Sequence, residues 1–385
     1  MYAIAKDKPF YWTLTLLNIF LWFPLDEGKT YTKCFFGLSA LLRTISLLSG
    51  LGTLVHLVLI IKDNIDMEIS EDIGDLTGFV GCMSVCLTFL FYHAEWSNFF
   101  NNLLKFKEFG QPPEYNEIVK KGNFIALMCI LYTVPGMLWY CFVSYMQVPQ
   151  CQKMNALKNL NEPCGMVNPT WMPIKQQEGM AFILCYLFQV IGIFVYLPSA
   201  FCITIIQFEA VEILVARLNH LKALFKEVFE AEDDRVRWKQ LQYCIRYHQD
   251  ILNVCNELAG WFQATCGSVF YTAAVVIGAL GSQVLKESTP KAISFIGGYV
   301  AASFLLCYAG QRLIDESLDV TDYVYDSRWY EMDARTKRVL VFVLKRCQKP
   351  ITLAAVPSMG SAGYILFFIM MKTSYSYLTL LNQMV

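Results

Sequence analysis

AFILCYLFQVIGIFVYLPSAFCITII, residues 181–206, contains no charged side chain. A helix needs roughly 20 consecutive apolar residues to cross the ~30 Å hydrocarbon core of a bilayer. An apolar stretch of this length is unusual in soluble globular domains and typical of membrane proteins. It therefore predicts a transmembrane helix and, with it, a protein embedded in a membrane.

Six further stretches are long enough to span the bilayer. They cover residues 34–61, 76–93, 124–147, 262–285, 292–311 and 351–371. The last is the weakest, because it contains Pro357 together with several glycines and serines. A shorter apolar run, residues 10–25, carries Trp12 and Trp22 near its ends, which favours a helix lying in the membrane interface. The predicted fold class is an all-α membrane protein with seven transmembrane helices.

The composition of the whole chain supports this class. Of the 385 residues, 56% are hydrophobic and only 16% are charged, against about 25% charged residues in soluble proteins. The net charge is −1, so no basic field favours binding to nucleic acid. The sequence has no Gly-x-Ser-x-Gly, phosphate-loop or His-Glu-x-x-His pattern, and its four histidines are scattered. These features argue against an enzyme, a cofactor and a metal site.

The positive charges are unevenly divided between the two sides of the predicted spans. The N-terminal segment and the connections after the second, fourth and sixth spans hold 23 of the 31 Lys and Arg residues, and the other connections hold 7. Arg43 lies inside the first span, within reach of the same side. Because Lys and Arg concentrate on the cytoplasmic side of membranes, we predict a cytoplasmic N-terminus and an extracellular C-terminus. This orientation is the reverse of that of a G-protein-coupled receptor.

Two segments on the predicted cytoplasmic side are amphipathic. In residues 207–261 and 312–350, apolar residues recur at three- and four-residue steps with charges between them, which is typical of helices. Asp233 and Asp234 interrupt the first pattern. Such helices bury their apolar stripes against one another or against another subunit. An intracellular helical anchor domain that joins subunits is one interpretation, and a solvated bundle within one chain is the alternative.

The predicted outer connections hold two features of interest. Residues 62–75 contain six acidic side chains, which form either a vestibule that attracts cations or a simply solvated loop. Residues 148–180 contain Cys151 and Cys164, which an oxidising exterior would allow to form a disulfide; the sequence leaves this open. Within the spans, aromatic and small residues indicate either a cavity for a compact apolar ligand or ordinary helix packing.

Four motifs near the C-terminus are distinctive. They are GQRLIDES (310–317), YDSRWYE (325–331), KRCQKP (345–350) and KTSYSYLTLLNQ (372–383). Together with Tyr247-His248-Gln249, they resemble the insect odorant receptor family. The resemblance implies a ligand-gated, non-selective cation channel in which four subunits surround a pore lined by the outer part of the seventh helix.

The resemblance also implies partners and a location. The short connection between the fourth and fifth spans is similar to that of an odour-tuning subunit, since the shared co-receptor has a much longer one. The implied partners are an odorant co-receptor subunit in a heterotetramer, a small apolar volatile, permeating cations and membrane lipid. The implied location is the plasma membrane of a sensory neuron dendrite.

Two alternatives remain beside this interpretation. A gustatory-type channel of the same superfamily would carry Thr-Tyr and a terminal Gln-Phe, where this chain has Ser376-Tyr377 and Gln383-Met384. A secondary transporter would suit the Pro and Gly residues that interrupt several spans, but seven spans do not divide into equal halves.

Site residues follow from the resemblance position by position. In the pore, Leu380 corresponds to a hydrophobic gate, Gln383 to the outer filter and Met384 to a second apolar constriction, while Asn382 replaces a basic residue. The implied ligand pocket lies between the second, third, fourth and sixth helices. Its candidate residues are Phe79, Val80, Met83, Thr133, Gly136, Tyr140, Phe182, Tyr186, Gln189, Phe295 and Tyr299. Thr133, Gly136 and Tyr140 share one helical face.

The predicted organisation has six parts. They are an N-terminal segment with the interfacial helix (1–33), a ligand-binding bundle of four spans (34–206), the first anchor helices (207–261), the fifth and sixth spans (262–311), a second anchor segment (312–350) and the pore-lining seventh helix (351–385).

Overall fold

The computed structural model describes residues 2–383 except residues 3, 26–27, 64, 66–68, 159, 161, 172–178, 288–289 and 357–359. The described residues form eleven α-helices, one short 3-10 helix and one two-stranded hairpin. The helices are α1 (Tyr11–Ile19), α2 (Lys29–Lys62), α3 (Ser70–Phe91), α4 (His93–Leu103), α5 (Tyr115–Met146), α6 (Val148–Lys158), α7 (Met180–Glu230), α8 (Asp234–Glu287), α9 (Pro290–Tyr325), η1 (Trp329–Glu331), α10 (Ala334–Cys347) and α11 (Tyr364–Gln383). The antiparallel strands are β1 (Ala354–Val356) and β2 (Gly360–Ser361).

Seven helices in the described residues are long and apolar enough to cross a membrane: α2, α3, α5, α7, α8, α9 and α11. The predicted all-α class with seven spans is therefore confirmed. Helix α8 lies at the centre of the bundle, where it packs against α3, α7, α9 and α11. Its direct contact with both α3 and α11 joins the second and seventh spans through one common helix.

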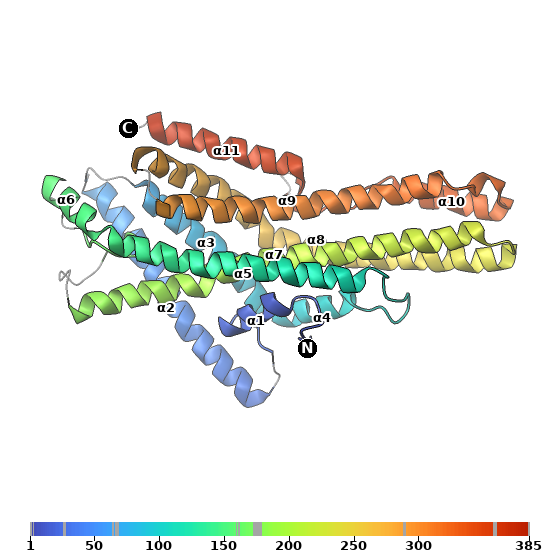
Figure 1. Cartoon of the computed structure of the whole chain (residues 1–385), viewed down its shortest axis with the longest axis horizontal. Helices are drawn as coiled ribbons and strands as arrows, with labels where there is room; N and C mark the ends of the chain where they lie inside the picture. The colour runs from blue at the N-terminus through green and yellow to red at the C-terminus, as the bar shows by residue number, and fades with distance from the viewer. Residues whose placement is uncertain are drawn as a thin grey trace.

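The molecule is elongated because three helices extend well beyond the bundle (Figure 1). Helices α7, α8 and α9 continue to one end, where α10 packs against α9. Helix α7 ends at Glu230 and α8 begins at Asp234, so the predicted interruption at Asp233 and Asp234 is confirmed. The apolar stripe of α7 is completely buried at Leu214, Leu218 and Leu221. Within one chain, these amphipathic helices therefore bury their stripes against one another.

The N-terminal run differs from the predicted interfacial helix. Helix α1 covers only part of it, and Trp22 is fully buried instead of lying at a membrane surface. The indole Nε1 of Trp22 donates to the carbonyl oxygen of Val195 in α7 at 2.7 Å. The guanidinium of Arg43 lies over the Trp22 ring at 4.0 Å and donates to the carbonyl of Leu21. Arg43 therefore turns inward, because the N-terminal segment offers it an aromatic face and a carbonyl.

Helix α4 was not predicted from the sequence. It buries Trp96, Phe99, Phe100 and Leu103 on one face, at the spacing of an amphipathic helix. The Trp96 ring lies 4.6 Å from that of Phe89 in α3, measured between centroids. The spacing of these residues in the sequence is typical of an amphipathic helix. The helix is too short to span a bilayer, however, and so was missed in a search for transmembrane segments.

The seventh span also lies elsewhere than predicted. The sequence indicated residues 351–371, but this region contains the β1–β2 hairpin, and the helix α11 begins only at Tyr364. Pro350, Gly360 and Gly363 explain the difference, because proline and glycine are the two poorest helix formers. One consequence is that Lys372, which follows the predicted span and is one of the seven basic residues counted on the outer side, lies in the middle of α11.

Candidate ligand cavity and seventh helix

An apolar cavity of about 430 Å³ lies within the helical bundle. We call it the apolar cavity. Residues of five helices line it: Gly81 and Cys82 of α3; Leu131, Tyr132, Thr133, Pro135, Gly136, Met137, Trp139 and Tyr140 of α5; Leu197, Ala200, Phe201 and Thr204 of α7; Val269 and Thr272 of α8; and Ser294, Phe295, Gly298, Tyr299 and Ala302 of α9. A volume of this size suits a small organic ligand.

Helices α5 and α9 form the aromatic wall of this cavity. The ring centroids of Tyr140 and Phe295 are 5.6 Å apart, and those of Phe295 and Tyr299 are 5.5 Å apart. Gly136 and Gly298 line the same space, and a Cβ at either position would meet no atom within 4 Å. The missing side chains thus contribute to the volume between the two helices.

Several of the hydroxyl groups that line the apolar cavity are hydrogen-bonded to the protein. The Thr133 hydroxyl donates to the Cys129 carbonyl at 2.7 Å, and the Thr272 hydroxyl donates to the Ser268 carbonyl at 3.0 Å. The Tyr299 hydroxyl lies 3.5 Å from the sulfur of Cys82. A ligand in this space would therefore be held mainly by apolar contact, with a few hydroxyls available to orient it.

Five of the eleven candidate pocket residues line the cavity, namely Thr133, Gly136, Tyr140, Phe295 and Tyr299. The three candidates from α3 do not. Phe79 packs edge-on against Tyr196, Met83 lies in the packed core, and Val80 is 58% exposed on the outside of the bundle. The rotation of α3 about its axis turns Gly81 and Cys82 toward the cavity instead.

The three candidates from α7 also lie outside the apolar cavity. The Tyr186 hydroxyl donates to the Cys141 carbonyl at 3.0 Å. The side chain of Phe182 lies beside the loop at Gly165. The Gln189 amide accepts a hydrogen bond from the backbone N–H of Val167 at 2.9 Å. The cavity contacts α7 at Leu197–Thr204, which lie farther from the N-terminal end of this helix than the three candidates do.

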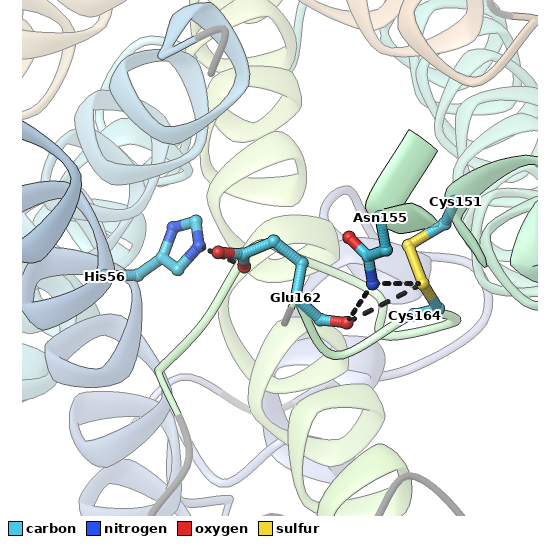
Figure 2. Close-up of a disulfide and its surroundings, with 5 residues drawn as sticks. All are labelled: His56, Cys151, Asn155, Glu162 and Cys164. Atoms are coloured by element: carbon cyan, nitrogen blue, oxygen red, sulfur yellow. Dashed lines mark hydrogen bonds and ion pairs between the residues drawn. A yellow bond between two sulfur atoms is a disulfide. The ribbon is translucent and has the colours of Figure 1, made fainter. Parts of the chain in front are cut away.

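Residues 162–171 cover the bundle at the N-terminal end of α7, and we call them the lid. Cys164 of the lid is joined to Cys151 of α6 by a disulfide (Figure 2). The side-chain amide of Asn155 donates to the Glu162 carbonyl at 2.9 Å. Further along, Trp171 donates its backbone N–H to the carbonyl of Gly52 in α2 at 3.0 Å. The lid is therefore fixed to helices α2, α6 and, through Gln189, α7.

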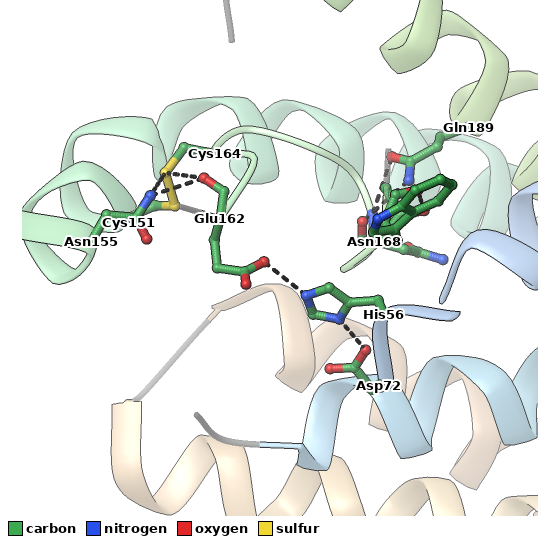
Figure 3. A network of polar contacts seen from close by, with 10 residues as sticks. His56, Asp72, Cys151, Asn155, Glu162, Cys164, Asn168 and Gln189 are labelled. Carbon is green, nitrogen blue, oxygen red and sulfur yellow. Dashed lines mark hydrogen bonds and ion pairs between the residues drawn. A yellow bond between two sulfur atoms is a disulfide. The ribbon is translucent and has the colours of Figure 1, made fainter. Parts of the chain in front are cut away.

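His56 of α2 joins the lid to α3 (Figure 3). Its Nδ1 lies 2.6 Å from a carboxylate oxygen of Asp72, and its Nε2 lies 2.8 Å from one of Glu162. Lys291, at the start of α9, forms an ion pair with Glu71 of α3 and donates to the Val167 carbonyl at 3.2 Å. Acidic residues 71 and 72, interpreted from sequence as part of a vestibule or solvated loop, therefore each have a basic partner inside the protein.

These groups line a second, polar cavity of about 350 Å³ beneath the lid. His56, Glu71, Asp72, Glu162 and Lys291 are among its lining residues. Among the described residues, none lines both this polar cavity and the apolar cavity. Across all the residues that the structure describes, no group of three or more His, Cys, Asp or Glu side chains has an arrangement that could hold a metal ion.

Helix α11 is held to the bundle by one face only. Leu366, Met370 and Ser374 are buried, at four-residue steps. A Cβ on Gly278 of α8 would lie 2.9 Å from the Ser374 carbonyl oxygen, so glycine permits this close approach. Leu380 is 51% exposed and Gln383 is exposed, so this chain leaves both uncovered. Met384, the third predicted pore residue, lies outside the described residues.

The chain matches the family model described as 7tm odorant receptor over residues 68–375. Among curated proteins, Odorant receptor 22c of Drosophila melanogaster is 30% identical over 163 residues, which cover 40% of this chain and 39% of that relative. Odorant receptor 67c of the same species is 21% identical over 279 residues, covering 70% of this chain and 67% of the relative.

The matched part is thus less than half the length of the first of these relatives. Among solved structures, the olfactory receptor OR5 from Machilis hrabei in complex with eugenol superposes with a TM-score of 0.77. The superposition covers 97% of this chain and 98% of that chain, at 14% sequence identity. At this identity the likeness concerns the fold.

Proposed function

The chain belongs to the 7tm odorant receptor family, and from this we propose that it is the odour-tuning subunit of a ligand-gated, non-selective cation channel. The observation that carries the proposal is the apolar cavity of about 430 Å³ inside the bundle, with its aromatic wall at Tyr140, Phe295 and Tyr299. Burying about 200 Å² of apolar ligand surface there would contribute about 5 kcal/mol before the costs of association.

The proposed ligand is a small, mostly apolar volatile. The lining offers few polar atoms, and those of Thr133 and Thr272 already have backbone partners. A hydroxyl or carbonyl on the ligand would find the Tyr299 hydroxyl, whose partner, the sulfur of Cys82, forms only weak hydrogen bonds. OR5 from Machilis hrabei has been solved with eugenol, and we place the ligand of this chain in the same general class of volatile.

The proposed orientation puts the lid outside the cell and α10 inside. The disulfide of Cys151 and Cys164 suits an oxidising exterior. The opposite end of the molecule is formed by α7, α8, α9 and α10 (Figure 1), whose segments 207–261 and 312–350 carry 15 of the 31 Lys and Arg residues. There, Phe342 and Val341 of α10 remain exposed. We assign this end as the cytoplasmic anchor that contacts a co-receptor subunit, with Phe342 in the contact.

The proposed gating route runs through α8 and α9, because both helices contact the cavity and the seventh helix. Helix α9 lines the cavity with Tyr299 and, farther along, sets Phe304 edge-on against Phe367 of α11 at 5.5 Å between centroids. Helix α8 lines it with Val269 and Thr272 and packs Gly278 against α11. A ligand that binds the open arrangement of these helices more tightly would shift the population toward it.

The proposal is tested by measuring whole-cell currents in cells that express the chain alone or with an insect odorant co-receptor. The panel consists of volatile alcohols, esters, ketones, terpenoids and phenols, with eugenol included. We expect cation currents only when both subunits are present. Currents from the chain alone would contradict the tuning-subunit role. Silence in both conditions, with the protein detected at the surface, would contradict the proposed function as a whole.

A paired substitution tests the cavity itself. Tyr140→Ala should shift ligand preference toward bulkier volatiles by about tenfold in the ratio of half-maximal concentrations, because it removes a ring from the cavity wall. Tyr186→Ala makes the same chemical change on a residue outside the cavity and should leave the rank order of ligands unchanged. Both variants should retain wild-type ion selectivity. If Tyr186→Ala changed the rank order of ligands more than Tyr140→Ala does, the ligand would bind outside the apolar cavity.

A further inference from the structure

The apolar cavity reaches the outside of the bundle along α5. Three of its lining residues on α5 are themselves about half exposed: Leu131 at 53%, Tyr132 at 50% and Trp139 at 50%. A residue that both lines a cavity and is exposed lies at its mouth. Because α5 is a span, this mouth opens toward the acyl chains and away from water.

The gap between α5 and α9 forms this mouth. The Tyr132 hydroxyl crosses it and donates to the carbonyl oxygen of Ser294 at 3.2 Å. A Cβ on Gly297 would lie only 3.1 Å from that same hydroxyl, so α9 leaves room for the phenol. Beyond the phenol, the space at Gly136 and Gly298 is open.

The route from the lid side is closed more firmly. Between the polar and apolar cavities lie Lys291 and Tyr140, with the Lys291 ammonium 4.9 Å from the centre of the Tyr140 ring. Lys291 is 7% exposed and paired with Glu71. Separating a buried ion pair slows passage by a factor of more than about a hundred, whereas breaking one hydrogen bond between a phenol and a carbonyl costs a factor of about five.

We propose that ligands enter the apolar cavity sideways from the membrane, through a portal between α5 and α9 that the hydrogen bond of Tyr132 to Ser294 holds closed. This inference rests on the proposed function, since it supplies the entry path for the same cavity. It also fits the ligand class: an apolar volatile concentrates in the bilayer, and it reaches this portal without crossing the charged groups beneath the lid.

A portal residue has a kinetic signature that a pocket residue lacks. Lowering the barrier speeds entry and exit by the same factor, and it leaves the equilibrium affinity unchanged. Tyr132→Phe removes the hydroxyl but keeps the ring, so both the onset and the washout of current should become about three- to fivefold faster. Because the ring that lines the cavity is kept, the half-maximal concentration should change by a smaller factor than the two rates.

The experiment uses fast perfusion of cells that express the full chain with the co-receptor, and the probe is the strongest activator from the volatile panel. Tyr145→Phe is the matched control, because Tyr145 is a half-exposed tyrosine of the same helix that does not line the apolar cavity. It should keep wild-type rates. A wild-type current establishes the channel independently of the portal. Unchanged rates in Tyr132→Phe, or a shifted half-maximal concentration with unchanged rates, would overturn the portal and leave the proposed function standing.

Discussion

Replacing Lys291 with methionine should lower the free energy of unfolding by about 3–5 kcal/mol, since it leaves the half-buried carboxylate of Glu71 and the buried one of Asp75 without a counter-charge. The Lys291 ammonium pairs with Glu71 and donates to the Val167 carbonyl at 3.2 Å. Asp75, one turn further along α3, is also buried, and one of its carboxylate oxygens has no hydrogen-bond partner. Methionine keeps most of the apolar length of lysine, so the change isolates the loss of the charge.

Thermal unfolding of the purified protein in lipid nanodiscs, followed by tryptophan fluorescence, measures this effect. We expect the midpoint of Lys291→Met to fall by roughly 4–6 °C. Lys153→Met is the matched control, because Lys153 is exposed on α6 and its replacement should change the midpoint by less than about 1 °C. Adding Glu71→Gln to Lys291→Met should recover part of the loss. A midpoint of Lys291→Met equal to wild type would mean that the ion pair contributes no net stability.

The transmembrane helices were predictable because their signal is local. A run such as residues 181–206 has no charge to place in lipid, and α7 indeed covers it. The start of α8 was predictable for a similar reason, since Asp233 and Asp234 interrupt an apolar stripe. The seventh span was misplaced because residues 351–371 and Tyr364–Gln383 are both apolar, and hydropathy gave too little weight to Pro350 and Gly360.

The cavity was only partly predictable, because its lining depends on how each helix is rotated and how deep the cavity lies. On α5, Thr133, Gly136 and Tyr140 share a face that the sequence shows directly. On α3, nothing in the sequence distinguishes Val80 from Cys82 as a cavity residue. The polar side chain of Gln189 in α7, predicted as a ligand contact, accepts a hydrogen bond from the backbone N–H of Val167. The sequence alone does not show which side chain will bond the backbone of a loop, because the two groups meet only in the folded protein.

Replacing Leu380 with alanine should produce a standing cation current in the absence of any volatile. We place Leu380 in the apolar gate because it is half exposed near the C-terminal end of α11, on a face that this chain leaves uncovered. A ring of apolar side chains blocks ions by excluding water, and truncation to a methyl group widens and wets it. Losing about 1.4 kcal/mol from the closed state multiplies the ratio of open to closed channels tenfold.

Three variants distinguish a hydrophobic gate from a general loosening of the seventh helix. Leu380→Met keeps an apolar side chain of similar size and should stay closed at rest, while Leu380→Gln keeps the length but attracts water and should leak as Leu380→Ala does. Ile365→Ala truncates another exposed apolar residue at the opposite end of α11, and its resting current should equal that of wild type. The resting current is measured with the co-receptor present and normalised to surface protein. If Leu380→Ala and Leu380→Gln both remain closed at rest, the gate lies at another position of the seventh helix, because no ring that depends on excluding water survives both changes.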